Sequence, residues 1–298
     1  MIPHRILLSG ATGFVGGALK RRLENLGSQV VPLTRKPLTT PHVWWKPDKG
    51  GLDPNSVADF DAVVHLAGAN IAEGRWTKAR KEEIWTSRVE ATKLLCQSLL
   101  ESGSPPKTFV SASAIGYYGN RGDELLNDQS SRGEGFLAEL CEEWEKASSD
   151  LELAGIRVCR LRIGVVFDPS GGTLKKLLPV FRYCLGGRLG PGTQWMSWVS
   201  LEDVVHGVVF ALERELRGSF TLASPNPVTN AEFTKQIANA VHRLAIIPAP
   251  TWLLRLAFGE MADELLLSST RVFPSGLTTS GFEFRHKTLE EFLRESVR

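Results

Sequence analysis

The chain has 298 residues, of which 42% are hydrophobic and 23% charged, a balance typical of a globular protein with a large core. Its formal net charge of +2 provides no basic field for nucleic acid or an anionic membrane surface, so we expect neither as a partner. The 4 cysteines are scattered without a C-x-x-C pair, which predicts reduced core residues and neither a disulfide framework nor a metal site.

The sequence contains no recognisable targeting or membrane-spanning segment. Residues 2–8 are too short and too interrupted for a signal peptide, and no later stretch of about 18 apolar residues occurs. We therefore expect a protein of the cytoplasm or of an organelle matrix.

The first half of the chain alternates strand and helix patterns. We predict strands at 6–8, 29–33, 62–66, 108–111 and 158–161, helices at 15–26, 79–102 and 136–149, and an irregular stretch at 37–59. Strands separated by helices pair in parallel through right-handed crossovers. The predicted fold is α/β, a doubly wound Rossmann sheet over residues 1–165, which places ligands beyond the carboxyl ends of its strands.

The second half is rich in glycine and has a different rhythm. We predict helices at 174–184, 201–212, 229–241 and 288–297, the third capped by Thr229 or Asn230, and one strand at 219–222. Residues 166–298 are therefore predicted to form a smaller C-terminal α+β substrate domain that closes over the ligand.

A glycine-rich turn follows the first strand and opens the first helix. In this setting glycines let the backbone approach a pyrophosphate, and the free N–H groups of the helix point at it. The predicted dinucleotide contacts are Gly10, Thr12, Gly13, Phe14, Val15 and Gly16. A glycine-rich connector without a ligand is the alternative.

The end of the second strand predicts which dinucleotide is bound. An NAD site usually offers a carboxylate there, whereas this chain has Arg35 and Lys36. A guanidinium matches a 2′-phosphate in geometry and charge, so NADP(H) is the expected cofactor. A solvated basic pair is the alternative interpretation.

Several motifs together resemble one enzyme superfamily. They are Gly10–Gly16, His65–Gly68, Ser111–Ser113 and 198–204, with further matching stretches at 87–92, 113–119, 136–139, 144–145, 161–166 and 194–198. The chain is similar to the extended, epimerase-like branch of the short-chain dehydrogenases/reductases. Within this branch it resembles the atypical epimerase family proteins, which include cell-division-inhibitor-like relatives of cyanobacteria and plastids and carry a C-terminal segment of unknown function.

This resemblance implies site residues in addition to the loop. A segment near 195–222 would return to the first domain. Thr34, Arg35 and Lys36 would hold the adenosine phosphate, and Leu66, Ala67 and Gly68 would line the adenine–ribose channel. Glu83, Arg88 and Arg162 would approach the cofactor, with Arg88 standing where the wider branch usually has an Asn.

One departure from the superfamily concerns catalysis. Its reductases use a Tyr whose pKa is lowered by a Lys four residues later. None of the 3 tyrosines here has such a Lys, and the expected helix reads Phe136-Leu137-Ala138-Glu139-Leu140. Either another group supplies the proton, or the protein binds NADP(H) without turnover.

Three residues are candidates for the missing catalytic group. Ser113 ends the strand where the branch keeps its catalytic Ser or Thr, and Tyr117 and Tyr118 follow closely. A turn cap is the alternative for Ser113, and ring packing for the tyrosines. Glu83 and Glu139 are further candidates for a general base, with solvated helix charges as the alternative, and His65 is expected to be a structural strand residue. Pocket walls and simple packing are both open for the side chains of Trp195, Trp198, Arg75 and Trp76.

Two functions remain open from the sequence. The first is an NADP(H)-dependent oxidoreductase, or an enzyme like the nucleoside-diphosphate-sugar epimerases, acting on an unknown small molecule. The second is a non-catalytic NADP(H)-binding regulator or redox sensor, linked to cell or organelle division as in some relatives. A homodimer or another protein partner is left open.

Overall fold

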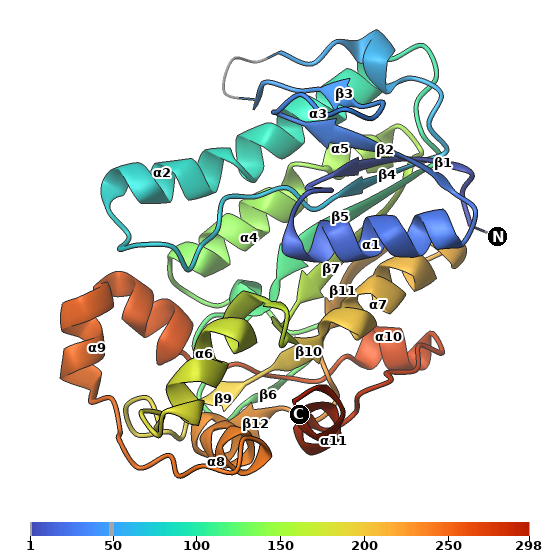
Figure 1. Cartoon of the computed structure of the whole chain (residues 1–298). Helices are drawn as coiled ribbons and strands as arrows, with labels where there is room; N and C mark the ends of the chain where they lie inside the picture. Colours follow the sequence, from blue (N-terminus) through green and yellow to red (C-terminus); the bar gives the residue numbers. More distant parts are fainter. Residues whose placement is uncertain (1, 48–50, 298) are drawn as a thin grey trace.

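The structure is a computed structural model that describes residues 2–47 and 51–297. Its central sheet has seven parallel strands in the order β11-β7-β5-β4-β1-β2-β3 (Figure 1). The strands are β1 (Arg5–Ser9), β2 (Gln29–Thr34), β3 (Val43–Trp44), β4 (Ala62–His65), β5 (Thr108–Ala114), β7 (Arg157–Ile163) and β11 (Gly218–Leu222). The chain adds strands on one side of β1 and then on the other, so the order reverses between β1 and β4, where such sheets bind ligands. This is the predicted α/β Rossmann fold.

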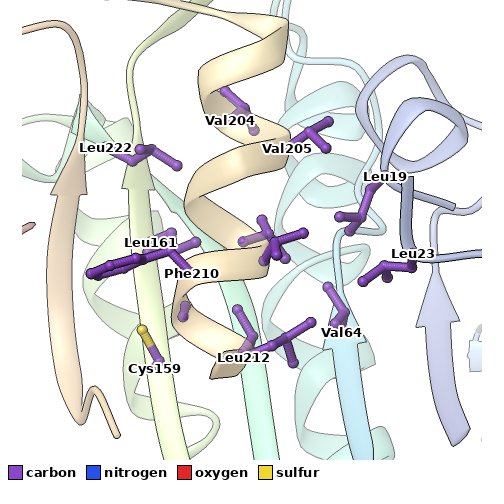
Figure 2. Packing of buried hydrophobic residues seen from close by; sticks show 14 of the residues in the cluster. Leu19, Leu23, Val64, Cys159, Leu161, Val204, Val205, Phe210, Leu212 and Leu222 are labelled. Atoms are coloured by element: carbon purple, nitrogen blue, oxygen red, sulfur yellow. The ribbon is translucent and has the colours of Figure 1, made fainter. Parts of the chain in front are cut away.

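Helices cover both faces of the sheet. One face carries α1 (Phe14–Asn25) and α7 (Leu201–Glu213), and the other carries α2 (Lys78–Thr86), α3 (Val89–Glu101), α4 (Phe136–Lys146) and α5 (Ser149–Leu153). Side chains alternate along a strand, so Ile6 and Leu8 face α1 and α7, whereas Leu7 packs with α3. Figure 2 shows α7 lying along β5 and β7, with Val204, Phe210 and Leu212 packed in the cluster that these strands share with the helix.

The C-terminal part is built from short elements around its own core. Three small strand pairs form, β8 (Val165–Asp168) with β10 (Trp198–Ser200), β9 (Trp195–Met196) with β12 (Val228–Thr229), and β6 (Leu125–Leu126) with β13 (Arg271–Val272). The helices are α6 (Gly172–Arg182), α8 (Asn230–Ala240), α9 (Thr251–Phe258), α10 (Ser275–Thr279), α11 (Leu289–Ser296) and the π-helix η4 (Ala262–Leu266). Phe167, Trp198, Phe233 and Phe292 fill the core between them.

Some predicted elements are divided in the structure. The helix expected at 79–102 breaks between α2 and α3, where the Ser87 hydroxyl donates to the Ile84 carbonyl and accepts from the Ala69 N–H, both at 3.0 Å. The stretch 37–59 contains β3 and the 3₁₀ helix η2 (Pro54–Val57). Within the described ranges, no helix is long and apolar enough to cross a bilayer.

Candidate functional site

The glycine-rich turn joins β1 to α1 in a compact loop. Gly10 has a φ of +72°, which favours glycine, and its carbonyl accepts from the Gly13 N–H at 2.9 Å. Gly13 is the N-cap of α1 and offers no side-chain cap, so the first N–H groups of the helix keep their bonding capacity. Thr12 and Gly13 are exposed at this end of the helix. The loop therefore presents backbone donors and a helix N-terminus to an anion.

Gly16 allows α1 to approach β1. A Cβ built at Gly16 would lie 2.1 Å from the Gly10 carbonyl oxygen, so no other residue fits without moving the loop. On the outer side, the ring of Phe14 fills the space above Gly171 and Gly172, because a Cβ at Gly171 would lie 2.4 Å from that ring. This contact ties the loop to the start of α6, and the sequence pattern did not indicate it.

Ser9 and His65 hold the backbone of residues 66–67, which follow β4 beside the glycine-rich loop. The Ser9 hydroxyl accepts from the N–H groups of Leu66 and Ala67 at 3.0 and 3.1 Å, so it donates to Nδ1 of His65 at 2.7 Å. Burial, together with the charge of Arg88, lowers the pKa of His65 to about 4. His65 is therefore a neutral structural group, as the sequence predicts.

The basic pair after β2 is exposed. Thr34 turns the chain there, with its hydroxyl bonded to the N–H and carbonyl of Lys36, both at 3.1 Å. Arg35 and Lys36 make no ion pair with any residue that the structure describes. Glu83 differs, because its carboxylate is held by Arg80 at 2.6 Å.

Arg88 carries a charge that no carboxylate offsets within the described chain. Its guanidinium lies beside Gly68, because a Cβ built on that glycine would be 3.0 Å from Cζ of Arg88. The same Cζ lies 5.3 Å from the centre of the Trp144 ring. Nη1 reaches the Ile84 carbonyl at 3.4 Å. Burial lowers the pKa of Arg88 to about 10, which leaves it protonated at neutral pH. A desolvated cation beside an open glycine is suited to an anionic ligand.

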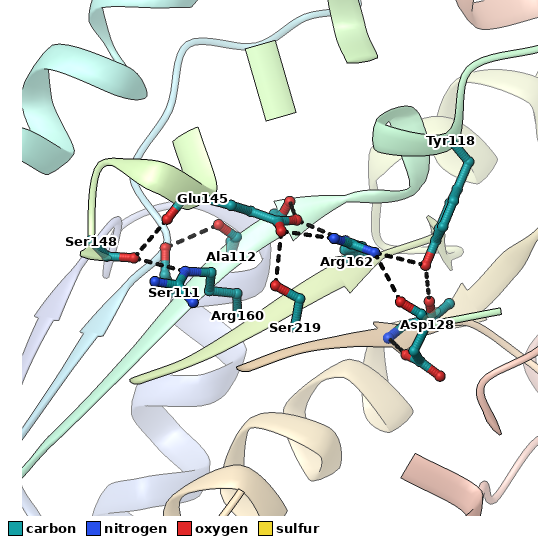
Figure 3. Close-up of polar contacts among 11 residues, drawn as sticks. Ser111, Ala112, Tyr118, Asp128, Glu145, Ser148, Arg160, Arg162 and Ser219 are labelled. Carbon is teal, nitrogen blue, oxygen red and sulfur yellow. Dashed lines mark hydrogen bonds and ion pairs between the residues drawn. The ribbon is translucent and has the colours of Figure 1, made fainter. Parts of the chain in front are cut away.

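Arg162 has a different environment, shown in Figure 3. Glu145 on α4 accepts two hydrogen bonds from its guanidinium, at 2.8 and 2.9 Å. The same carboxylate accepts from the hydroxyls of Ser113 at 2.7 Å and Ser219 at 2.8 Å. Ser113 is buried, and its only hydroxyl proton is donated to Glu145.

The two adjacent tyrosines have unequal surroundings. Tyr118 is fully buried, its hydroxyl lies 2.7 Å from Thr221 Oγ1, and it accepts from Arg162 at 3.1 Å. Burial raises its pKa. Tyr117 is partly exposed, and its ring lies 3.5 Å below the Arg162 guanidinium, edge-on to Tyr118. Within the part of the chain that the structure describes, the Tyr118 phenol is hydrogen-bonded and the Tyr117 phenol is not.

The face of α4 that meets the end of β5 is apolar. Gly116, just beyond β5, lies against Leu137 and Cys141, with a built Cβ at 3.2 and 3.6 Å from their side chains. Burial raises the pKa of Cys141 to about 12, so it stays a thiol. Glu264 of η4 caps the helix, accepting from the N–H groups of Phe136 and Leu137 at 2.9 and 2.8 Å. The Tyr and Lys of a relay are four residues apart, and Leu137 and Cys141 of α4 have this spacing. Neither side chain is a phenol or an ammonium group.

The aromatic candidates also differ from one another. Trp198 is fully buried in the C-terminal core, and its indole N–H donates to the Asn226 carbonyl at 3.2 Å. Its side chain is therefore part of the core and does not line a pocket. Trp76 packs edge-on against Phe136 and donates to the Ile71 carbonyl. Trp195 is partly exposed and donates to Asp123 at 2.6 Å.

Three groups of the predicted cofactor residues lie at the carboxyl ends of neighbouring strands: the glycine-rich loop follows β1, the basic pair follows β2, and residues 66–68 follow β4. Glu83 lies on α2 and Arg88 at the start of α3, while Glu83 and Arg162 are already held by Arg80 and Glu145. Sequence reasoning missed Glu145 and Glu264, since no local pattern links a helix carboxylate to an arginine or a helix end that folding brings to it.

Comparisons with known proteins extend over nearly the whole chain. The NAD dependent epimerase/dehydratase family matches residues 6–222, and a domain of unknown function, DUF1731, matches residues 249–296. An epimerase family protein of Mycobacterium bovis is 42% identical over 290 residues, which cover 97% of this chain and 96% of that protein. A chloroplastic epimerase family protein of Arabidopsis thaliana is 34% identical over 97% of this chain and 85% of its own length.

A solved structure supports the same assignment. The human epimerase family protein SDR39U1, crystallised with NADPH, superposes with a TM-score of 0.90 at 30% identity, covering 98% of this chain and 99% of that one. The resemblance drawn from the sequence motifs is confirmed. The chain belongs to the NAD dependent epimerase/dehydratase family, within the short-chain dehydrogenases/reductases, and carries the DUF1731 segment of its atypical branch.

Proposed function

We propose that this protein binds NADP(H) across the carboxyl ends of β1, β2 and β4. The pyrophosphate would lie on the N-terminus of α1, at Gly10, Thr12, Gly13, Phe14, Val15 and Gly16. The adenosine 2′-phosphate would lie on Thr34, Arg35 and Lys36, and the adenine and ribose along Leu66, Ala67 and Gly68. The similar human protein crystallised with NADPH supports this choice.

One observation carries the proposal. Gly16 approaches the Gly10 carbonyl so closely that a Cβ would be 2.1 Å away, which forms a tight turn below an uncapped helix N-terminus. Arg88, with no carboxylate partner in the described chain, would meet the negative charge or the ribose hydroxyls of the cofactor from beside Gly68. Glu83 and Arg162 would not contact the cofactor directly. Glu83 would position Arg80 through their ion pair, and Arg162 would position Tyr117 by lying over its ring.

The cofactor preference is testable at Arg35. Arg35→Glu would place a carboxylate against the 2′-phosphate, so NADPH should bind at least about tenfold more weakly while NADH changes little. Lys107→Glu is the matched control, because Lys107 is also exposed but lies at the amino end of β5. Fluorescence titration of both cofactors reads the result. An equal loss for NADPH and NADH in Arg35→Glu contradicts the assignment.

We further propose an oxidoreductase that reduces the carbonyl of a small molecule. Bound NADPH supplies a hydride, and the protein must supply or conduct a proton. Tyr117 is the proposed donor, because Tyr118 and Ser113 are bonded within the protein, to Thr221 and Glu145. Arg162 over the Tyr117 ring would stabilise the phenolate that remains.

A non-catalytic NADP(H)-binding regulator is the second candidate, and it too has an observation in its favour. Ser113 donates to Glu145 and α4 offers Leu137 and Cys141, so the usual relay is absent from the end of β5. A screen of carbonyl compounds for NADPH oxidation separates the two. Turnover that Tyr117→Phe reduces more than tenfold, with unchanged NADPH affinity, supports the enzyme; no turnover above the substrate-free rate, with NADPH bound, supports the regulator.

A further inference from the structure

The short strand β13 turns one arginine away from the core. Val272 is fully buried with Tyr118, Leu126 and Ala223. Neighbouring residues of a strand point to opposite sides, so the Arg271 side chain leaves the other face of the β6–β13 pair. It rests on Trp195, with Cζ 4.2 Å from the ring centre.

The guanidinium of Arg271 is held in place by an aromatic ring, but no carboxylate of the described chain neutralises its charge. Trp195, on which it lies, is fixed by its indole N–H, which donates to Asp123 at 2.6 Å. The Nε of Arg271 is buried and has no hydrogen-bond partner in the described chain. No ion pair within residues 2–47 and 51–297 involves this side chain.

The three arginines of β7 differ from Arg271, because each is hydrogen-bonded or ion-paired within the protein. Arg160 is paired with Glu152 at 2.8 Å and Arg162 with Glu145 at 2.8 Å, while Arg157 donates to the carbonyls of residues 211, 212 and 214. A half-desolvated guanidinium left without an acceptor costs free energy. Arg271 therefore has the environment of a group whose partner is a ligand.

The backbone around Arg271 is hydrogen-bonded to segments that lie beyond the carboxyl ends of β5 and β7. Ser197 Oγ donates to the Thr270 carbonyl at 2.8 Å and accepts from the Val272 N–H at 3.0 Å, and the Ser197 carbonyl accepts from Val165, just beyond β7. On the other side, Thr270 Oγ1 donates at 2.9 Å to the carbonyl of Gly119, two residues after Tyr117. The backbone at Arg271 thus lies between the continuations of β5 and β7, at the end of the sheet where ligands of such folds collect.

We propose that Arg271, supported by the Trp195 ring, binds a carboxylate or phosphate group of the substrate. This rests on the proposed function, and it defines the substrate class as a small organic anion that contains a carbonyl. In the reduction, hydride from NADPH joins the carbonyl carbon, the C=O π pair takes a proton from Tyr117, and the products are an anionic alcohol and NADP⁺. Water then returns a proton to Tyr117.

Three small probes test the charge requirement on the whole chain, both with NADP⁺ added and without it. Benzoate carries a carboxylate, phenyl phosphate a phosphate, and benzyl alcohol has no charge. Ligand-observed NMR titration should show saturable binding of at least one anion, and that anion should bind at least about tenfold more weakly to Arg271→Gln. Which anion binds decides between carboxylate and phosphate.

Two more variants make the result specific. Arg255→Gln is the control, because Arg255 is exposed on α9 and paired with Asp263, and it should leave anion binding unchanged. Arg271→Lys keeps the charge without the forked geometry and should retain part of the affinity, which also covers the case that Arg271→Gln does not fold.

The proposal is overturned if neither anion binds the wild-type protein, if benzyl alcohol binds as tightly as the anions, or if Arg271→Gln and Arg271→Lys both bind as the wild type does. NADPH affinity is measured in parallel and should be unchanged in the Arg271 variants. A wild-type protein that binds an anion but not NADPH refutes the proposed function and leaves the Arg271 site standing.

Discussion

The guanidinium of Arg162 and the carboxylate of Glu145 form a two-point ion pair that fastens β7 to α4. Nε lies 2.8 Å from Oε1 and Nη2 lies 2.9 Å from Oε2, and both side chains are nearly excluded from solvent. The Glu145 carboxylate also accepts from the hydroxyl of Ser113, and from that of Ser219 as Figure 3 shows. It therefore fixes β5, β7 and β11 relative to α4, the helix that faces the proposed reaction site.

Removing one partner of this pair should destabilise the fold. Glu145→Gln leaves the Arg162 guanidinium buried without its counter-charge, so we expect the free energy of unfolding to fall by about 3–5 kcal/mol. Glu143→Gln is the control on the same helix, because Glu143 is half exposed and pairs with Lys146 at the surface. Urea unfolding followed by circular dichroism measures both variants. Equal stability of the two variants would contradict the structural role of the pair.

Gly16 and Gly17 are adjacent in α1 but should respond oppositely to alanine. The Cβ of Gly16→Ala would lie 2.1 Å from the Gly10 carbonyl oxygen and should displace the loop, weakening NADPH at least about tenfold. The Cβ of Gly17→Ala would lie 3.6 Å from the nearest atom, an ordinary contact. Within a helix this change should raise stability by about 0.5–1 kcal/mol and leave NADPH binding intact. Thermal melts and fluorescence titrations measure the pair, and similar NADPH affinities would argue against the loop as the phosphate site.

His65 should make stability depend on pH. Its pKa is about 4 in the folded protein and 6.5 as the ordinary value, because burial disfavours the imidazolium. The unfolded chain therefore binds the proton first, and stability present above pH 6.5 is lost as the pH falls toward 4, by about 3 kcal/mol in total. His65→Asn removes the titrating group, so the drop in unfolding free energy between pH 7 and pH 5 should be smaller in the variant. The measurement is urea unfolding at both pH values; identical drops would exclude His65 as a source of the acid sensitivity.

The sequence predicted the parts of the site that consist of consecutive residues. The strand, the loop with Gly10, Gly13 and Gly16, and the following helix are encoded by local backbone preferences and by an apolar pattern, so the Rossmann architecture was expected before the structure. Arg35 and Lys36 follow β2 directly, so their place at the edge of the sheet was also predictable. The sequence itself also shows that no tyrosine is followed four residues later by a lysine.

The structure decided which of the candidate groups are available for chemistry. Ser113, Tyr118 and Arg162 were plausible site residues by position, yet they are bonded to Glu145 and Thr221, which lie 32 and 103 residues away in the case of Ser113 and Tyr118. Trp195 and Arg271 meet only because β9 and β13 come together in the fold. Local preferences act between neighbours along the chain, whereas the pairing of a buried charge or hydroxyl depends on which distant segments pack beside it. The sequence by itself therefore determined the cofactor-binding architecture, and the tertiary packing determined which side chains within it remain unpaired.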